Sequence, residues 1–285
     1  MKVTIGLPVY NAENYIEDCI ISILNQSYTE FKLLIIDDGS TDNSIEIIKK
    51  FKDNRIQLIV DGDNKALASR LNQIAELCET KYLVRMDADD IMHKDRIKRQ
   101  IEILDNNPDI DVLGTNCYTI DDKNKIIGTR YKYSGEKSLK IVNSFIHPTI
   151  IAKTTWYLEN PYDTKIRRSQ DAELWERTRE KSVFKSFTEP LLFYREFGGS
   201  YYKKYWVNLK SKGVILSNYF RGESKSKFVK YFFSVYIKAA IVTLSYTILS
   251  IFNKESLLIN LRSVKLKRKD RDNAARYLLE AIDKG

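Results

Sequence analysis

Residues 31–42 read Phe31-Lys32-Leu33-Leu34-Ile35-Ile36-Asp37-Asp38-Gly39-Ser40-Thr41-Asp42, an apolar run that changes abruptly into acidic and small polar residues. A short run rich in Ile and Leu that ends in Asp, Gly and Ser is typical of a buried strand followed by a loop. Residues 44–51 then carry apolar side chains at the spacing of an α-helix. This stretch therefore predicts one strand–loop–helix unit of an α/β fold.

The same alternation continues on both sides of this unit. Strand-like apolar runs occupy residues 2–8, 56–60 and 81–86, and helical periods occupy residues 13–25 and 66–78. Strands that alternate with helices at this spacing form βαβ units, in which helices cover both faces of a parallel sheet. The predicted fold class is therefore α/β, with a Rossmann-type, mostly parallel sheet and flanking helices.

The pattern after this alternation is mixed. The predicted elements are a helix, a hairpin, a second helix and a last strand, at residues 95–104, 112–131, 169–179 and 190–195. Together with the βαβ units they are expected to form one domain over residues 1–200. Residues 201–285 are expected to form a separate, helical C-terminal segment.

This C-terminal segment is basic and contains a long apolar run. Residues 200–285 carry 18 Lys and Arg against 6 Asp and Glu, a net charge of +12, whereas the whole chain carries +9. Only Lys230 and Lys238 interrupt the apolar run at residues 229–252. The uncharged part, residues 239–252, is shorter than the roughly 20 apolar residues that span a bilayer.

The polar side chains of this run fall on one side of a helix. They are Lys227, Lys230, Ser234, Lys238 and Ser245. A largely apolar helix with one basic stripe is typical of a helix that lies in the membrane interface, although a tilted span with Lys238 reaching the surface stays open. The expected partner of residues 201–285 is therefore the anionic inner face of the cell membrane.

Several other classes of protein are disfavoured. The Lys and Arg of the C-terminal segment interleave with an apolar run rather than with an aromatic RNA-binding motif, so no nucleic-acid partner is expected. Cys19, Cys78 and Cys117 are widely spaced and form no CxxC or Cys–His pattern, which argues against a zinc site or a disulfide framework. The chain opens on a strand-like run without a secretory leader, which predicts a cytoplasmic location.

Polar, mostly acidic residues follow each of the four predicted parallel strands, where the ligand crevice of such sheets lies. They stand at residues 8–11, 37–42, 61–64 and 87–90. Many carboxylates in one crevice predict a cation between them, and Mg²⁺ and Mn²⁺ bind Asp together with substrate phosphates. In Asp87-Ala88-Asp89 the two carboxylates share one face of an extended chain, so that one can bind metal while the other reaches a hydroxyl. Alone, this pattern is more typical of a surface turn.

The order of the motifs resembles the inverting, GT-A-type glycosyltransferases of family 2 over roughly residues 3–200. Pro8-Val9-Tyr10-Asn11 resembles the Pro-x-Tyr-Asn of that family, and residues 37–42 resemble its Asp-Asp-Gly-Ser-x-Asp. Asn64 with residues 67–72 resembles its Asn-x-Gly-x-x-x-Ala-Arg-Asn segment, and Asp87-Ala88-Asp89-Asp90 follows.

Two later segments extend the resemblance. Residues 169–175, Ser-Gln-Asp-Ala-Glu-Leu-Trp, resemble the acceptor-side Glu-Asp-x-x-Leu-Trp motif. Tyr194-Arg195 followed by Ser200 resembles the closing Tyr-Arg-x-His-x-x-Ser.

The resemblance implies a site for a nucleotide-sugar donor. Asp38 is expected to hydrogen-bond a uracil ring, Asp87 to contact ribose or sugar, and Asp89 to coordinate Mn²⁺ or Mg²⁺. The other implied donor-binding residues are Pro8, Tyr10, Asn11, Arg70, Arg195 and Ser200. Asp171 is the implied general base, because inversion requires a group that takes the proton of the acceptor hydroxyl. His147 is kept as a second-tier metal ligand, although a lone His in a polar turn is more often structural.

The chain departs from the family pattern at three positions. Gln170 stands where the family has Glu, Phe197 where it has His, and Ala66 where it has Gly. The missing His removes one contact to the diphosphate, for which Arg195, Ser200 or a C-terminal Lys can substitute. A catalytically silent donor-fold module in a membrane glycan-assembly complex is therefore the alternative. A nucleotidyltransferase is disfavoured, since residues 8–14 contain neither Gly nor Lys.

The expected activity is that of a metal-dependent, inverting hexosyl- or N-acetylhexosaminyl-transferase. The expected donor is a UDP-sugar, on the Asp38 resemblance, and the expected acceptor is a hydroxyl of a glycan or lipid-linked saccharide in cell-surface polysaccharide biosynthesis. The transferred sugar, the linkage and the oligomeric state have no portable sequence signature.

Overall fold

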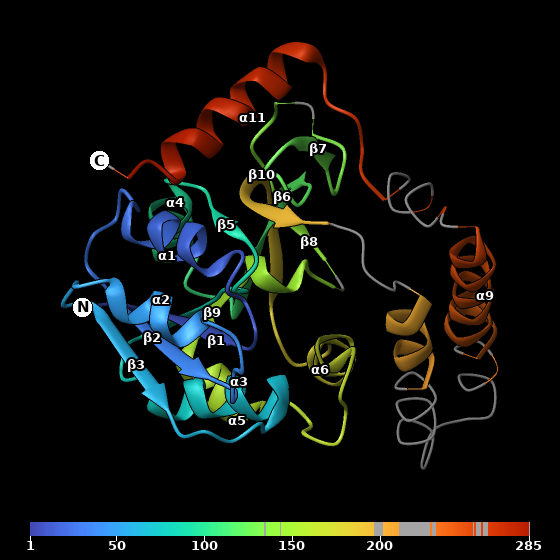
Figure 1. The fold of residues 1–285 in the computed structure, drawn as a ribbon, viewed down its shortest axis with the longest axis horizontal. Helices are drawn as coiled ribbons and strands as arrows, with labels where there is room; N and C mark the ends of the chain where they lie inside the picture. Colours follow the sequence, from blue (N-terminus) through green and yellow to red (C-terminus); the bar gives the residue numbers. More distant parts are fainter. Residues whose placement is uncertain are drawn as a thin grey trace.

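The computed structural model describes residues 1–133, 135–142, 144–196, 202–210, 229, 232–252, 254, 258 and 262–284. Within these residues, ten strands form one mixed sheet at the centre of the molecule, and helices cover both of its faces (Figure 1). The predicted α/β class with a mostly parallel central sheet and flanking helices is confirmed.

The first half of the chain builds the parallel part of the sheet. Its strands β1 to β4 lie in the order β3-β2-β1-β4 and span Val3–Val9, Phe31–Asp37, Ile56–Val60 and Tyr82–Arg85. The helices α1, α2 and α3 between them span Ile16–Leu24, Ser44–Lys50 and Ala66–Leu77. Each of these elements overlaps the range predicted from its apolar pattern.

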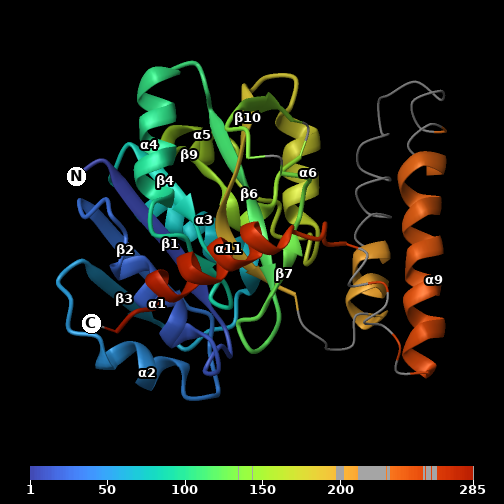
Figure 2. The same ribbon diagram turned by 90° about the horizontal axis from the view of Figure 1, so that it is seen from above.

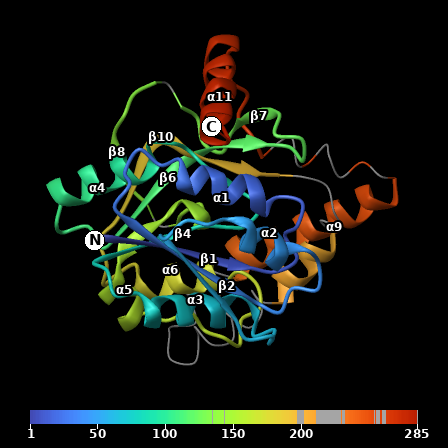
Figure 3. The same cartoon turned by 60° about the vertical axis from the view of Figure 1, so that its left-hand side comes forward.

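Alternate residues of these strands face two separate apolar layers. Ile5 and Leu33 belong to the layer that α1 and α4 (Arg96–Asn106) cover, whereas Leu34 belongs to the layer on the opposite face. That opposite layer is covered by α3, α5 (Thr154–Glu159) and α6 (Gln170–Thr178), as Figure 3 shows. Helix α3 approaches β1 so closely that a Cβ at Gly6 would collide with Ile74.

The second half of the chain extends the sheet beyond β4. Strand β9 (Ile151–Lys153) runs antiparallel between β4 and β6 (Val112–Ile120), and β6 pairs in parallel with β10 (Phe184–Arg195). Three short strands, β5, β7 and β8, pair antiparallel with β10 or β6 and span Ile91–Met92, Ile126–Thr129 and Leu139–Ile141. The predicted hairpin is therefore present as β6 and β7.

Strand β10 is longer than predicted. The apolar pattern indicated only residues 190–195, but the strand begins at Phe184 and its pairing with β6 shifts register on both sides of Pro190. Because proline cannot donate to the ladder, it interrupts a strand and hides the continuation from a sequence pattern.

The C-terminal part of the chain first leaves the sheet domain and then returns to it. Residues 202–210 are helical, and a π-helical turn at Phe232–Ile237 leads into α9 (Lys238–Ile251), which lies to one side of the sheet domain in Figures 1 and 2. Of the predicted polar stripe, Lys227 and Lys230 lie outside the described residues. No helix among the described residues has the length and hydropathy of a membrane span.

The last helix, α11 (Arg268–Ala281), packs against the sheet. Its buried side chains Ala274 and Leu278 form one cluster with residues of β5, β6, β7 and β10. Asn25 Nδ2, just after α1, donates to the carbonyl of Ala281 at 3.1 Å. The final residues thus belong to the same packed unit as β6 and β10.

Arg70 on α3 joins the ends of β2 and β3. It is fully buried, and its Nε donates to Asp38 Oδ1 at 2.8 Å. Its Nη1 and Nη2 donate to the two oxygens of Asp61, and the remaining N–H groups donate to Gln73 Oε1 and the carbonyl of Asp63. All five donors are therefore used within the protein, and these contacts, the Asp61 hydrogen bonds first, raise the pKa of Arg70.

Replacing Arg70 is expected to destabilise the fold. Arg70→Met leaves the buried Asp38 carboxylate without its guanidinium, which should lower the free energy of unfolding by about 3 kcal/mol. Urea unfolding followed by circular dichroism measures this loss. Lys65→Met is the matched control, because Lys65 Nζ also pairs with Asp61, at 2.8 Å, but is exposed. Equal losses in the two variants would contradict the assigned role of Arg70.

Candidate active site

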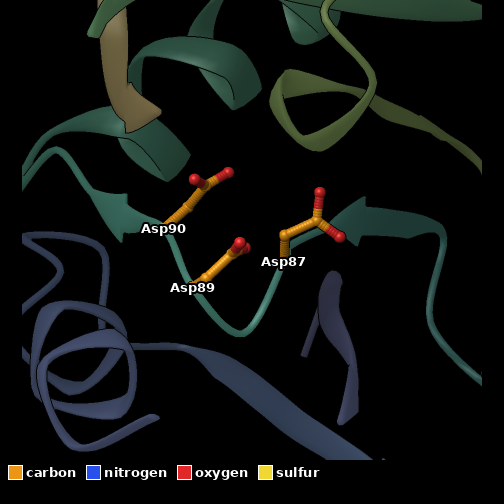
Figure 4. A group of neighbouring side chains, drawn as sticks. All are labelled: Asp87, Asp89 and Asp90. Atoms are coloured by element: carbon orange, nitrogen blue, oxygen red, sulfur yellow. The ribbon is translucent and has the colours of Figure 1, made fainter. Parts of the chain in front are cut away.

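Three aspartates of the loop between β4 and β5 form a compact cluster. Ligand atoms of Asp87, Asp89 and Asp90 all lie within 4.8 Å of one another. Figure 4 shows the three side chains extending to the same side of the loop. This cluster contains the sequence-predicted Asp87 and Asp89 and adds Asp90 to them.

Asp87 is held by a buried arginine that the sequence analysis did not single out. Arg85, the last residue of β4, donates through Nη2 to Asp87 Oδ1 and through Nη1 to the carbonyl of Met86. The available signal was a charged residue at the end of an otherwise apolar strand, two positions before an aspartate. A charge in such a position requires a partner.

Asp89 and Asp90 have carboxyl groups that resist ionisation. Burial and then the charge of Asp87 raise the pKa of Asp89 to about 6. Asp90 is 1% exposed; its Oδ2 has no hydrogen-bond partner among the described residues, and burial, followed by the charges of Asp89 and Asp87, raises its pKa well above the ordinary value. An orphaned buried oxygen beside two further carboxylates fits a divalent cation that takes oxygen ligands, such as Mg²⁺ or Mn²⁺.

Arg195, at the end of β10, fixes this loop from the other half of the sheet. Its backbone N–H donates to Asp90 Oδ1 at 2.8 Å, and its Nε donates to the carbonyl of Asp89 at 2.7 Å. Its Nη1 donates to the carbonyl of Asp121 at 2.9 Å, and the guanidinium lies 4.5 Å from the centre of the Tyr15 ring. Arg195 thus orients the aspartate loop.

The ends of β1 and β2 are joined beside this loop. Asn11, which has a positive φ of 48°, donates its N–H to Ser40 Oγ at 3.0 Å and accepts the N–H of Thr41 on Oδ1 at 2.8 Å. Pro8 is buried within β1, whereas Tyr10 directly after the strand is 53% exposed. Tyr10 therefore presents an aromatic ring to solvent directly after β1.

Asp38 is positioned at the end of β2 by two elements. Its Oδ1 accepts the backbone N–H of Lys65 at 2.7 Å as well as the Nε of Arg70, and its carbonyl accepts Asn64 Nδ2 at 3.0 Å. All five N–H donors of Arg70 bind Asp38, Asp61 and their neighbours within the protein. The geometry therefore gives Arg70 a supporting position for Asp38, rather than the approach to a diphosphate that the family resemblance implied.

Asp171 lies in the first turn of α6, where backbone N–H groups face its carboxylate. Burial raises the pKa of Asp171, the N–H groups of Ala172 and of Asp171 itself oppose that shift, and the negative charge of Asp87 adds to it. A carboxylate with a raised pKa accepts protons more readily near neutral pH. Asp171 is therefore a partly exposed carboxylate whose pKa is raised.

Two predicted site residues remain, His147 and Ser200. His147 is not part of the aspartate cluster: its Nε2 and the Tyr162 hydroxyl are 2.8 Å apart, and its ring lies 6.1 Å from that of Trp175. Burial, followed by the nearby Arg85, lowers its pKa well below the ordinary value, so that the ring is neutral. Ser200 and Phe197 lie outside the described residues.

Comparisons with known proteins agree with this geometry. The chain matches the family Glycosyl transferase family 2 over residues 4–184. It is 32% identical over 203 residues to an uncharacterized glycosyltransferase of Methanocaldococcus jannaschii, covering 68% of this chain and 70% of that protein. It is 30% identical over 198 residues to the putative glycosyltransferase EpsE of Bacillus subtilis, covering 63% of this chain and 67% of that protein.

Two solved structures share the fold at low sequence identity. Staphylococcus aureus TarS in complex with UDP-GlcNAc has a TM-score of 0.62 at 18% identity and covers 99% of this chain and 82% of that chain. The mannosyltransferase PcManGT of Pyrobaculum calidifontis, in complex with GDP-Man and Mn²⁺, has a TM-score of 0.59 at 15% identity, with 98% and 85% covered. The fold is therefore GT-A-like, and the chain belongs to glycosyl transferase family 2.

Proposed function

We propose that this protein transfers a sugar, with inversion, from a UDP-sugar to a hydroxyl of a glycan or lipid-linked acceptor in cell-surface polysaccharide biosynthesis. The observation that carries the proposal is a compact aspartate cluster together with the separate carboxylate of Asp171, whose pKa the negative charge of Asp87 helps to raise. The family match and the UDP-GlcNAc complex of TarS support it. The similarity to the hyaluronan synthase of Pasteurella multocida, 24% identical over 221 residues, supports a saccharide acceptor.

The residues of the cluster would hold a divalent cation. Asp89 would bind it, with Asp90 Oδ2 and Asp87 beside it. When bound, Mn²⁺ or Mg²⁺ supplies positive charge next to the diphosphate of the donor. The Mn²⁺ in the PcManGT complex supports this choice of ion.

The chain's own side chains divide the other tasks. Tyr10 offers its exposed ring to the base of the nucleotide, and Asp38 offers a positioned carboxylate to the polar edge of that base. Asp171 accepts the proton of the acceptor hydroxyl while the oxygen of that hydroxyl bonds to the anomeric carbon of the donor sugar. The bond from that carbon to the diphosphate breaks at the same time, and its electron pair leaves with the nucleoside diphosphate.

We also propose that α9 holds the protein on the inner face of an anionic membrane. Ile241, Leu244, Ile248 and Ile251 form one exposed apolar face and are between 48% and 73% exposed. The opposite face is buried, because Tyr246 stacks on Tyr205 with a ring separation of 4.3 Å. An exposed apolar face on a segment of net charge +12 is typical of an interfacial helix.

The donor proposal predicts selective stabilisation by a nucleotide sugar. Thermal unfolding with Mn²⁺ and a panel of UDP-, GDP- and dTDP-sugars should show the largest rise in melting temperature with a UDP-sugar, because a ligand that binds the folded state stabilises it. The same panel with EDTA is the control, and its response should be smaller. A chain that binds a UDP-sugar but transfers and hydrolyses none of it would instead be the catalytically silent module.

The base assignment predicts a separation of catalysis from binding. Asp171→Asn should lower transfer by about 10²- to 10⁴-fold, because the amide cannot accept the hydroxyl proton. Donor affinity, measured by calorimetry, should stay at the wild-type value. Glu173→Gln, two residues along the same helix, is the matched control and should keep its activity. Wild-type turnover by Asp171→Asn would exclude Asp171 as the base.

The membrane proposal predicts that negative charges on the exposed apolar face of α9 weaken vesicle binding. The double variant Leu244→Asp/Ile248→Asp should bind phosphatidylglycerol vesicles at least about tenfold more weakly in sedimentation, since each buried apolar side chain contributes about 1.5–3 kcal/mol. Leu158→Asp, an exposed position on α5, is the control and should sediment like wild type. Wild-type protein that stays in the supernatant at low salt would refute the proposal.

A further inference from the structure

A cavity of about 200 Å³ lies beside the aspartate loop, and residues of the sheet domain and of the C-terminal segment line it. Asp89, Tyr194 and Arg195 come from the sheet domain, and Arg168 precedes α6. Lys204, Tyr205 and Asn208 come from the helix at residues 202–210, and Arg262 comes from the segment that leads to α11. The cavity therefore brings Asp89 of the proposed metal loop together with cationic residues of the C-terminal segment.

Positive charge dominates this cavity. Four cationic side chains and one carboxylate line it, in the order Asp89, Arg168, Arg195, Lys204 and Arg262 along the chain. Burial, and then the charge of Arg168, lowers the pKa of Lys204, and Arg262 acts in the same direction. Cationic side chains that lie close together repel one another, and a bound anion would offset this repulsion.

The cationic residues of the C-terminal segment are held in place. Arg262 Nη1 lies 3.4 Å from Glu196 Oε1, which directly follows β10 and is 1% exposed. The neighbouring Val264 donates to and accepts from the backbone of Thr129 in β7. The helix that carries Lys204 is anchored by a hydrogen bond from Ser169 Oγ to Asn208 Oδ1. These contacts position both cations beside Asp89.

The volume of the cavity indicates which part of the donor it can hold. Sites for whole small-molecule ligands typically measure about 300–1,000 Å³, so a cavity of about 200 Å³ fits the diphosphate and not the complete nucleotide sugar. A diphosphate is also the group that gains negative charge when the sugar is transferred. Donors aimed at such developing charge are among the strongest contributions to catalysis.

We propose that Lys204 and Arg262 bind the diphosphate of the donor and stabilise the departing nucleoside diphosphate. This inference rests on the proposed function and assigns to the C-terminal segment a part of the donor site. The anomeric carbon passes to the acceptor oxygen, Asp171 receives the proton, and the electron pair of the broken bond stays on the phosphate oxygen that faces these two cations.

Calorimetry with a nucleoside diphosphate and its nucleoside tests the inference. Lys204→Met should weaken UDP binding by about 10- to 100-fold, because a charged hydrogen bond contributes about 1.5–3 kcal/mol, and should leave the affinity for uridine unchanged. Lys204→Arg should recover most of the UDP affinity. Lys203→Met is the matched control and should bind UDP like wild type, since Lys203 is adjacent to Lys204 and equally classed as exposed but does not line the cavity.

The outcomes separate this inference from the proposed function. If wild-type protein binds UDP and Lys204→Met binds it equally well, Lys204 is not a diphosphate ligand and the proposed function stands. If Lys204→Met loses UDP and uridine to the same extent, the lysine supports the structure only, and the inference also fails. If wild-type protein binds none of UDP, GDP and dTDP, the proposed function fails and the inference falls with it.

Discussion

Three carboxylates enclosed in one loop are the constraint on which the rest of the site depends. Carboxylates this close repel one another, and Asp90 has also lost its hydration, so Asp87, Asp89 and Asp90 require donors and positive charge around them. Arg85 supplies a partner from within β4, and the backbone of Arg195 supplies one from the end of β10. Since β4 and β10 belong to different halves of the sheet, the loop links these halves a second time, in addition to the pairing of β9 with β4 and β6.

The C-terminal segment reaches this point on two separate passes. The helix at residues 202–210 follows β10 and is hydrogen-bonded beside α6, whereas Arg262 arrives just before Val264 pairs with β7. Helix α11 then buries Ala274 and Leu278 against the sheet, which holds the second pass in place. The C-terminal segment, whose composition differs from that of the domain, is thus attached to the sheet by its last helix. Helix α9 lies in the chain between the helix at residues 202–210 and Arg262.

The elements that could be predicted are those whose sequence pattern lies within a few neighbouring residues. Apolar runs followed by acidic loops predicted β1 to β4, and the spacing of carboxylates predicted the metal candidates, because both patterns lie within a few residues. The docking of α11 has no such signal: its buried face consists of small or isolated apolar residues, and its partners in β6 and β10 are far away in the sequence. The cavity lined by Lys204 and Arg262 was unpredictable in detail for the same reason, since spatial convergence of distant residues leaves no local pattern.

The arginines of the site show that a family motif predicts where a residue lies in the fold better than it predicts what the residue binds. Arg70 and Arg195 both occupy expected motif positions, yet Arg70 spends every donor on Asp38, Asp61 and their neighbours, and Arg195 donates to two backbone carbonyls of the loops it orders. The Arg70 guanidinium is buried and paired with two carboxylates, whereas Arg195 keeps its positive charge, because backbone carbonyls do not neutralise it, and lines the cavity beside Asp89. Besides Arg195, the positive charge that faces the cavity comes from residues outside the motifs, and the C-terminal segment contributes Lys204 and Arg262 to it. Donor binding in this chain is therefore expected to depend on a segment that the family match, which ends at residue 184, does not include.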